Sequence, residues 1–167
     1  VFSVQIVYVT LQKLGKQDNY VLYIADADGA NPRTMLRSNE PILSPSWSAD
    51  GQRIAYVTYD PMLSPKGYRD KQMAVYIQDI RTGKRNRVSV GRGIHGAPAW
   101  SPDGTKMALT ISANGNPDLY ILELRTGILT RLTNDHAIDT EPDWSPDGQA
   151  IVFTSDRSGT PQIYRMS

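Results

Sequence analysis

The sequence has no cysteine among its 167 residues, so it offers no disulfide, no thiolate metal site and no cysteine nucleophile. It also has no apolar run of the roughly 18 residues that a membrane-spanning helix needs, and we expect no direct membrane insertion. It has no excess of one charge either, with 18 basic and 17 acidic residues spread along the chain. Without a run of like charges, neither nucleic acid nor an anionic membrane surface is an expected partner.

The N-terminus lacks an initiator methionine and a secretion signal. Val1, Phe2 and Ser3 are not followed by a basic segment and an apolar signal core. We therefore expect a mature product or a piece of a longer protein. The hydrophobic content of 40% is enough for the core of one domain, which excludes a disordered chain as the default.

What the chain does contain is an internal repeat built around three tryptophans. The three copies are Ser-Pro-Ser-Trp-Ser-Ala-Asp-Gly at 44–51, Ala-Pro-Ala-Trp-Ser-Pro-Asp-Gly at 97–104 and Glu-Pro-Asp-Trp-Ser-Pro-Asp-Gly at 141–148. Each tryptophan is followed seven residues later by an apolar strand pattern, at Ile54, Met107 and Ile151. Because Ser-Pro-Asp-Gly is typical of a type I turn, each repeat predicts two strands joined by a tight turn.

Two further strands complete each repeat. Tyr120 and Tyr164 lie 20 residues after their tryptophans and predict a third strand, whereas Tyr76 lies 29 residues after Trp47. The extra residues fall in 60–72, whose prolines and glycine indicate a loop. Arg-Thr-Gly turns at 81–83 and 125–127 then predict short fourth strands at 86–90 and 128–133.

The N-terminal part fits the same frame, with strands expected at 6–10, 20–26 and 33–37 and with Tyr23 in the tyrosine position, but it has no tryptophan strand. The chain also stops after the third strand of its last repeat.

Units of about 44 residues with four antiparallel strands are the spacing of β-propeller blades. The sequence therefore predicts an all-β, partial β-propeller of about three and a half blades, with strands in groups of three, four, four and three. One domain would cover residues 1–167, with blades at about 1–38, 39–91, 92–135 and 136–167. The repeated tryptophans and tyrosines are expected to pack between blades, and no helix is predicted.

Three patterns that carry chemistry in other proteins do not predict it here. Residues 91–96 match a dinucleotide-binding glycine pattern, but Pro98 and Pro102 prevent the helix that this motif requires. His95 and His136 stand in equivalent places, and with Asp135, Asp139 and Glu141 nearby they make a metal pair conceivable, yet they lack ligand spacing and are expected to be surface residues. We predict no metal and no cofactor.

Catalysis is not expected either. No Gly-x-Ser-x-Gly nucleophile elbow occurs, and Asp50, Asp103 and Asp147 lie in the repeated turns, where a structural role is expected. The sequence therefore predicts a protein that is not an enzyme.

A binding face follows from the strand order of a four-stranded meander. The repetitive turns lie on one face, whereas the irregular loops lie on the other, and variable loops on a rigid scaffold are where binding usually occurs. Around the central channel of that face we predict a partner-binding rim of mixed polar and apolar residues. Its members are Glu40, Pro41, Leu43, Ile94, His95, Ala97, Asp139, Thr140 and Glu141. Lys66, Tyr68, Arg69, Asp156, Arg157 and Thr160 are expected farther out.

The residue pattern of the repeats resembles that of one protein family. Trp-Ser-Pro-Asp-Gly followed by Thr-Ser-Asp-Arg-Ser-Gly-Thr-Pro-Gln-Ile-Tyr at 154–164 is similar to the TolB-type propeller repeat of the Tol–Pal system. The resemblance covers nearly the whole chain and is closest at 44–58, 96–109 and 140–164. Thr140 and Glu141 match the family's binding canyon, whereas the segment 92–95 matches it loosely and the loop 60–72 is longer than expected.

The resemblance implies a periplasmic, non-enzymatic interaction module. Its expected partners are the peptidoglycan-associated lipoprotein Pal, TolA and the translocation segments of some colicins, in a system for outer-membrane integrity and cell division. Similar repeats occur in prolyl-oligopeptidase-like peptidases, so the non-catalytic propeller of such an enzyme is the alternative. Six blades would need about 260 residues at this period, so the chain resembles a fragment whose open blade edges are expected to self-associate.

Overall fold

Every regular element of this protein is a β-strand in the computed structural model, which describes residues 4–60, 72–88, 94–112 and 115–167. The strands are β1 Gln5–Leu14, β2 Gln17–Asp26, β3 Arg33–Ser38, β4 Ile42–Trp47, β5 Arg53–Tyr59, β6 Met73–Asp79, β7 Arg85–Arg87, β8 Ile94–Trp100, β9 Lys106–Ser112, β10 Asp118–Glu123, β11 Leu129–Arg131, β12 Asp139–Trp144, β13 Ile151–Ser155 and β14 Gln162–Met166. Across these ranges no helix has the length and apolar character to cross a membrane.

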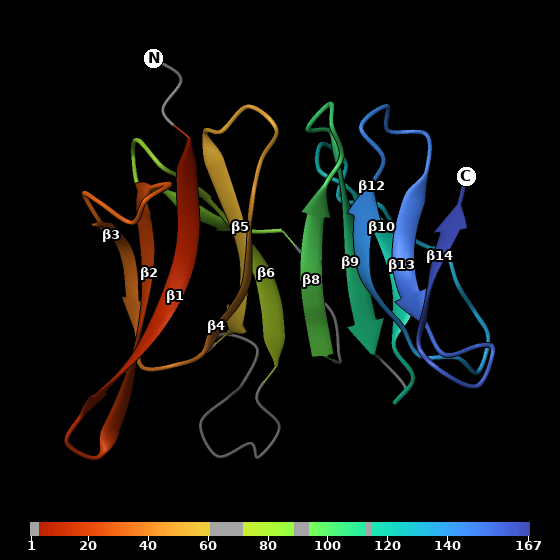
Figure 1. The fold of residues 1–167 in the computed structure, drawn as a ribbon, viewed down its shortest axis with the longest axis horizontal. Helices are drawn as coiled ribbons and strands as arrows, with labels where there is room; N and C mark the ends of the chain where they lie inside the picture. The colour runs from red at the N-terminus through yellow and green to blue at the C-terminus, as the bar shows by residue number, and fades with distance from the viewer. Residues whose placement is uncertain (1–3, 61–71, 89–93, 113–114) are drawn as a thin grey trace.

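The strands form four antiparallel sheets that follow one another along the chain. Their orders are β1-β2-β3, β4-β5-β6-β7, β8-β9-β10-β11 and β12-β13-β14, and we call them blades A, B, C and D. The innermost strands of neighbouring blades contact each other, β4 with β8 and β8 with β12, and the four blades lie side by side (Figure 1). The predicted partial propeller, with three, four, four and three strands, is confirmed.

The two ends of the blades differ, as the meander predicts. The Ser-Pro-Asp-Gly type turns at 48–51, 101–104 and 145–148 lie at what we call the upper end, the top of Figure 1. The β1–β2 and β13–β14 hairpins and the β3–β4 and β11–β12 links lie at the lower end. Backbone hydrogen bonds tie connections of the same end together: Leu124 donates to Thr105 at the upper end, and Asp139 donates to Pro117 at the lower end.

Hydrogen bonds within each upper turn explain the repeated Ser-x-Asp-Gly. The Ser101 hydroxyl donates to Asp103 at 2.6 Å and accepts the Lys106 N–H at 2.9 Å. Gly104 has φ 68°, a left-handed conformation that glycine adopts without steric cost. Blades B and D repeat the serine–aspartate pair with Ser48–Asp50 and Ser145–Asp147. These aspartates are turn residues, as predicted.

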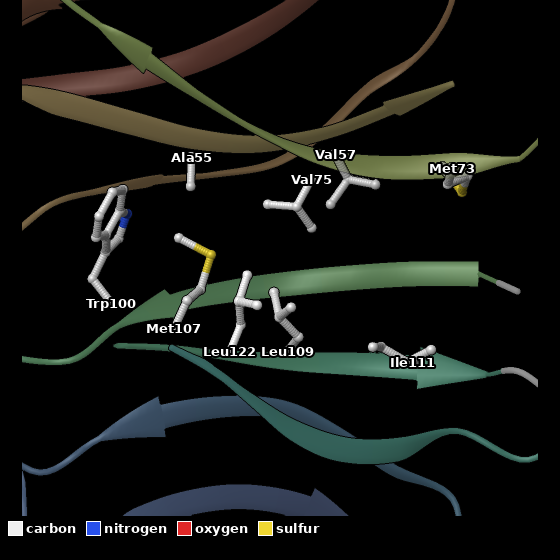
Figure 2. Close-up of a cluster of buried hydrophobic side chains, with 9 residues drawn as sticks. All are labelled: Ala55, Val57, Met73, Val75, Trp100, Met107, Leu109, Ile111 and Leu122. Atoms are coloured by element: carbon white, nitrogen blue, oxygen red, sulfur yellow. The ribbon is translucent and has the colours of Figure 1, made fainter. Parts of the chain in front are cut away.

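The core lies between blades rather than within one sheet. Figure 2 shows the cluster between blades B and C, in which Val57 and Val75 face Leu109, Met107 and Trp100. A second cluster joins blades A and B through Leu22, Ile24, Ile42, Ile54 and Tyr56. Burying a side chain of this size contributes about 1.5–3 kcal/mol, so each blade depends on its neighbour for stability. Trp100 is buried between blades B and C, Tyr120 packs against the same cluster, and Tyr76 packs against the second, as predicted for the repeated aromatic residues.

Strand lengths depart from the prediction in two places. β1 and β2 each have 10 residues and pair as far as Leu14 with Gln17, although the polar sequence at 12–19 predicted no strand there. The backbone ladder of a hairpin explains this extension, because it needs no apolar side chains. The outer strands β7 and β11 are shorter than predicted, with three residues each. Residues 61–71 of the predicted 60–72 loop lie outside the described ranges.

Candidate functional site

The innermost strands of blades B, C and D share one irregularity near their lower ends. The pairing register breaks between Leu43 and Ser46 in β4, between Gly96 and Ala99 in β8, and between Thr140 and Asp143 in β12. At each break a β-bulge is formed, which bends the strand and re-aims its side chains. The three bulges are in equivalent places, so they surround the same side of the blade array.

A non-glycine residue with positive φ precedes a proline in every bulge. The values are 47° for Ser44, 45° for Ala97 and 53° for Glu141. A left-handed conformation costs roughly 1–2 kcal/mol for such residues, and this kind of strain is often found at functional sites. Its recurrence in three blades shows that the repeat itself imposes the conformation.

The predicted rim residues that are accessible lie at or just before these bulges. Leu43 is 43% exposed and Glu141 is exposed, whereas Pro41, Ala97 and Thr140 are half-buried. The rim therefore has the predicted mixture of polar and apolar groups. Ile94 and His95 belong to β8, but their side chains lie outside the described part of the structure.

Glu40 and Ile138 extend the rim into the β3–β4 link and the β11–β12 link, respectively. Glu40 is half-buried, and its backbone N–H donates to the Ser38 hydroxyl at 2.9 Å. Ile138 is exposed and directly precedes β12, although the sequence did not single it out. Its exposed apolar side chain next to a bulge is a feature that only the fold reveals.

Asp139 has a different place from the other rim residues. Its side chain is 0% exposed, and the Arg157 guanidinium donates to both of its carboxylate oxygens at 3.0 Å. A fully buried carboxylate cannot contact a partner in this structure. Asp139 therefore lies buried beneath the rim, where it binds Arg157, and does not form part of the rim surface.

Arg157 is the centre of the interactions that hold the lower end of blade D. Its guanidinium carbon lies 5.2 Å from the Phe153 ring centre and 4.9 Å from the Tyr164 ring centre. Its Nε–H donates to the Ser155 hydroxyl at 2.9 Å, and a terminal nitrogen lies 3.5 Å from Asp135. The hydrogen bond to Asp139 raises the pKa of Arg157, so this side chain stays charged.

These contacts connect the β13–β14 hairpin to the start of β12. Ile138 N–H also donates to Asp156 of the hairpin at 2.8 Å. Because β12 begins at Asp139 and continues into Thr140 and Glu141, the hairpin positions the exposed end of the rim. The sequence analysis predicted Arg157 as an outer contact residue and missed this supporting role, although an arginine two residues after a buried strand was a usable signal.

Blades B and C contain similar acid–base pairs. Arg87 contacts Asp60 at 2.5 Å, and Arg131 contacts Asp118 at 2.5 Å, with both carboxylates buried. Both aspartates border the connection between the second and third strands of their blade. One arginine–aspartate pair therefore stabilises the lower end in each of three blades.

An open cleft lies beside the rim on blade D. Its volume is about 580 Å³, and its walls include Asp135, His136, Asp156 and Arg157. Among the residues with described positions, no three histidine, cysteine, aspartate or glutamate side chains gather to hold a metal. The arrangement offers a broad surface with a shallow recess, which suits contact with a protein.

Comparison with known proteins agrees with the observed propeller fold. The family model described as the TolB beta propeller domain matches residues 1–167. The Tol-Pal system protein TolB of Alcanivorax borkumensis is 51% identical over 114 residues, which cover 68% of this chain and 24% of that protein. The protein of the same name in Xanthomonas oryzae pv. oryzae is 49% identical over 96 residues, covering 58% of this chain and 20% of its own length.

Among solved structures, TolB from Acinetobacter baumannii is similar with a TM-score of 0.84 and 46% identity, covering 96% of this chain and 38% of that protein. A puromycin hydrolase variant has a TM-score of 0.68 but 16% identity, a likeness that shows the fold alone. The chain thus spans about a quarter of the curated relatives and 38% of the solved TolB. The chain belongs to the TolB β-propeller family.

Proposed function

We propose that this chain is a non-enzymatic, periplasmic protein-binding part of the Tol-Pal system, and that its lower end binds Pal. The observation that carries the proposal is the rim formed by three equivalent strained bulges in the innermost strands of blades B, C and D. The accessible contacts would be Glu40, Pro41, Leu43, Ala97, Ile138, Thr140 and Glu141, together with the predicted Ile94 and His95. The names of the relatives support the assignment to the system, and the cell-division role follows from the family resemblance.

The character of the rim favours a folded protein or a peptide as its ligand. Exposed Leu43 and Ile138 supply apolar area, and Glu141 supplies a charge. Protein interfaces combine an apolar centre with polar groups that select the partner. TolA and colicin translocation segments are further candidates, which the family resemblance suggests.

The absence of catalysis is part of the proposal. A general base works best when its pKa lies near the working pH. Hydrogen bonds from Ser101 and Thr105 lower the pKa of Asp103 to about 2, so this carboxylate is a weak base. Asp118 and Asp139 are each paired with an arginine. In this proposal, the hydrogen bonds and ion pairs of Asp103, Asp118 and Asp139 stabilise the fold, and none of the three carboxylates acts as a general base.

The proposal is tested by titration calorimetry with the periplasmic domain of Pal. Glu141→Ala and Thr140→Ala should each weaken binding by roughly 1–3 kcal/mol if they lie at the centre of the interface. Arg125→Ala, in an exposed upper-end turn, is the matched control and should bind like the parent. Equal affinities of Glu141→Ala and the parent, or a larger loss in Arg125→Ala, would show that the lower end is not the binding face.

A further inference from the structure

A groove lies between blades B and C at the upper end of the array. Its volume is about 350 Å³, within the range of roughly 300–1,000 Å³ that is typical of sites for small ligands. Both blades have all four strands, so complete sheets form its walls. Leu124 lines the groove, and its N–H donates to the Thr105 carbonyl beside an upper turn. The groove is therefore separate from the rim at the lower end.

One wall of the groove is apolar. It is formed by Ile77 of β6, Val88 just after β7 and Leu124 just after β10. All three side chains are half-buried and pack against the core cluster between blades B and C. The core fixes their positions, and their remaining surface faces the groove. This wall suits an apolar side chain of a ligand.

Arg53 is held in a fixed orientation beside this wall. Its guanidinium carbon lies 4.9 Å from the centre of the Trp100 ring, and Trp100 lies at one end of the cluster in Figure 2. The Asp50 carboxylate is 3.6 Å from a terminal nitrogen of Arg53, which is too long for a hydrogen bond. Because a guanidinium has five N–H donors, Arg53 can bind a further carboxylate.

Lys84 adds a second cation to the same groove. Its side chain is exposed and follows Gly83 in the turn between β6 and β7. The blade repeat does not require a lysine at this position, because the residue after the Arg-Thr-Gly turn of blade C is Ile128. The position of Arg53 is occupied in blade C by Lys106. The pair of cations is thus a feature of blade B that blade C lacks.

Asp79 is the acidic residue that lines the groove, and its carboxylate already has three donors. It accepts the Arg81 N–H at 3.0 Å, the Thr82 N–H at 2.7 Å and the Thr82 hydroxyl at 2.8 Å. These hydrogen bonds stabilise the turn at 79–84 and offset the negative charge. Two cations beside one compensated carboxylate favour an anionic ligand.

We propose that this groove binds the C-terminal residue of a peptide or protein whose last side chain is apolar. The terminal carboxylate contacts Arg53 and Lys84, and the last side chain packs against Ile77, Val88 and Leu124. A chain terminus carries its carboxylate and its side chain on the same Cα, which matches cations next to an apolar wall in a small groove. A guanidinium binds a carboxylate with two parallel hydrogen bonds. This inference does not depend on Pal binding at the lower end.

The first experiment uses the peptide N-acetyl-Ala-Ala-Leu with a free C-terminal carboxylate. In the chain labelled with ¹⁵N-tryptophan, this peptide should shift the Trp100 indole resonance with saturation, because Arg53 stacks on that ring, and leave the Trp144 resonance in place. No saturable shift at Trp100 up to millimolar peptide would overturn the proposal.

Three further peptides distinguish the parts of the ligand. The C-terminal amide of the same sequence should bind about tenfold more weakly, because it lacks the charge. A peptide that ends in glycine should lose about tenfold as well, because it lacks the apolar side chain. N-acetyl-Ala-Glu-Ala amide, whose carboxylate belongs to a side chain, should also bind more weakly than the leucine peptide. Equal affinity of any of the three would overturn the proposed ligand.

Charge-removing variants test the two cations. Arg53→Gln should lower the affinity for the leucine peptide about tenfold, and Lys84→Gln about fivefold. Lys106→Gln, at the position equivalent to Arg53 in blade C, is the matched control and should bind like the parent. Since Lys84 is exposed, its variant keeps the fold and decides the question even if Arg53→Gln destabilises blade B. Parent affinity in Lys84→Gln, or an equal loss in Lys106→Gln, would contradict the proposed site.

Discussion

At the scale of single residues, the ion pair between the buried Asp139 and Arg157 stabilises the lower end of blade D. Arg157 binds it through two hydrogen bonds of 3.0 Å and stacks on two aromatic rings. Removing one member of a buried ion pair leaves an uncompensated charge, which typically costs about 3–5 kcal/mol. Because Arg157 itself is partly exposed, the lower part of this range applies.

Arg157→Met should therefore lower the free energy of unfolding by about 3 kcal/mol, measured by urea denaturation. Arg125→Met, an exposed arginine in the upper turn at 125–127, should change it by less than about 0.5 kcal/mol. Adding Asp139→Asn to Arg157→Met should restore part of the stability, because the unpaired charge is removed. A loss no larger than that of the Arg125 control would contradict the supporting role of Arg157.

At the scale of structural elements, the upper turns are units held by an ionised aspartate. The Ser101 hydroxyl, followed by the Thr105 amide and hydroxyl, lowers the pKa of Asp103 to about 2 from its ordinary value of 3.8. The same kind of hydrogen bonds, from Ser48 and Ser145 first, lower the pKa of Asp50 and Asp147. A lowered pKa means that the folded state favours the charged carboxylate.

The turns should therefore contribute full stability above about pH 4 and lose it as the pH falls toward 2, where the folded carboxylates become protonated. Circular dichroism during acid titration should show this loss. Asp103→Asn should be less stable than the parent at pH 7 but should lose less between pH 4 and 2. Parallel pH curves for the parent and Asp103→Asn would refute the role of this carboxylate.

Strand order, turns and blade-packing aromatics could be predicted because each leaves a local pattern in the sequence. Trp100 and Gly104, for example, recur at fixed spacing. The length of β1 and β2 could not be predicted, because backbone pairing of the hairpin extends through polar residues such as Lys13 and Asp18. Burial of Asp139 could not be predicted either, since it depends on Arg157 18 residues away.

The rim, too, could be predicted from the sequence only in part. The meander rule predicted that Thr140 and Glu141 lie on the face of the irregular loops, and β12, to which both belong, begins at the lower end (Figure 1). The left-handed conformation of Ser44, Ala97 and Glu141 could not be predicted, because none of them is glycine and a residue before proline ordinarily adopts an extended conformation.

At the scale of the whole molecule, the blade array leaves an uncovered face on blade D. Ile163 is 73% exposed, whereas Val75, at the equivalent position in blade B, is 0% exposed because blade C covers it. Exposed apolar surface of this kind drives association. We therefore expect the chain to self-associate through this face.

Sedimentation velocity over a range of concentrations should show this self-association. Ile163→Ser should weaken it without lowering the unfolding temperature, because the side chain is already exposed. Arg125→Ser, an exposed residue in an upper turn away from this face, is the control. A monodisperse monomer at all concentrations, or equal behaviour of both variants, would show that this face does not associate.

The central claim is that the lower end is the recognition face, and hydrogen exchange of the chain with and without the periplasmic domain of Pal tests it most directly. We predict that Pal slows amide exchange at residues 39–44, 96–99 and 138–143, around the three bulges. The upper turns at 48–51, 101–104 and 145–148 should exchange as they do in the free chain. Protection confined to these upper turns would contradict the account.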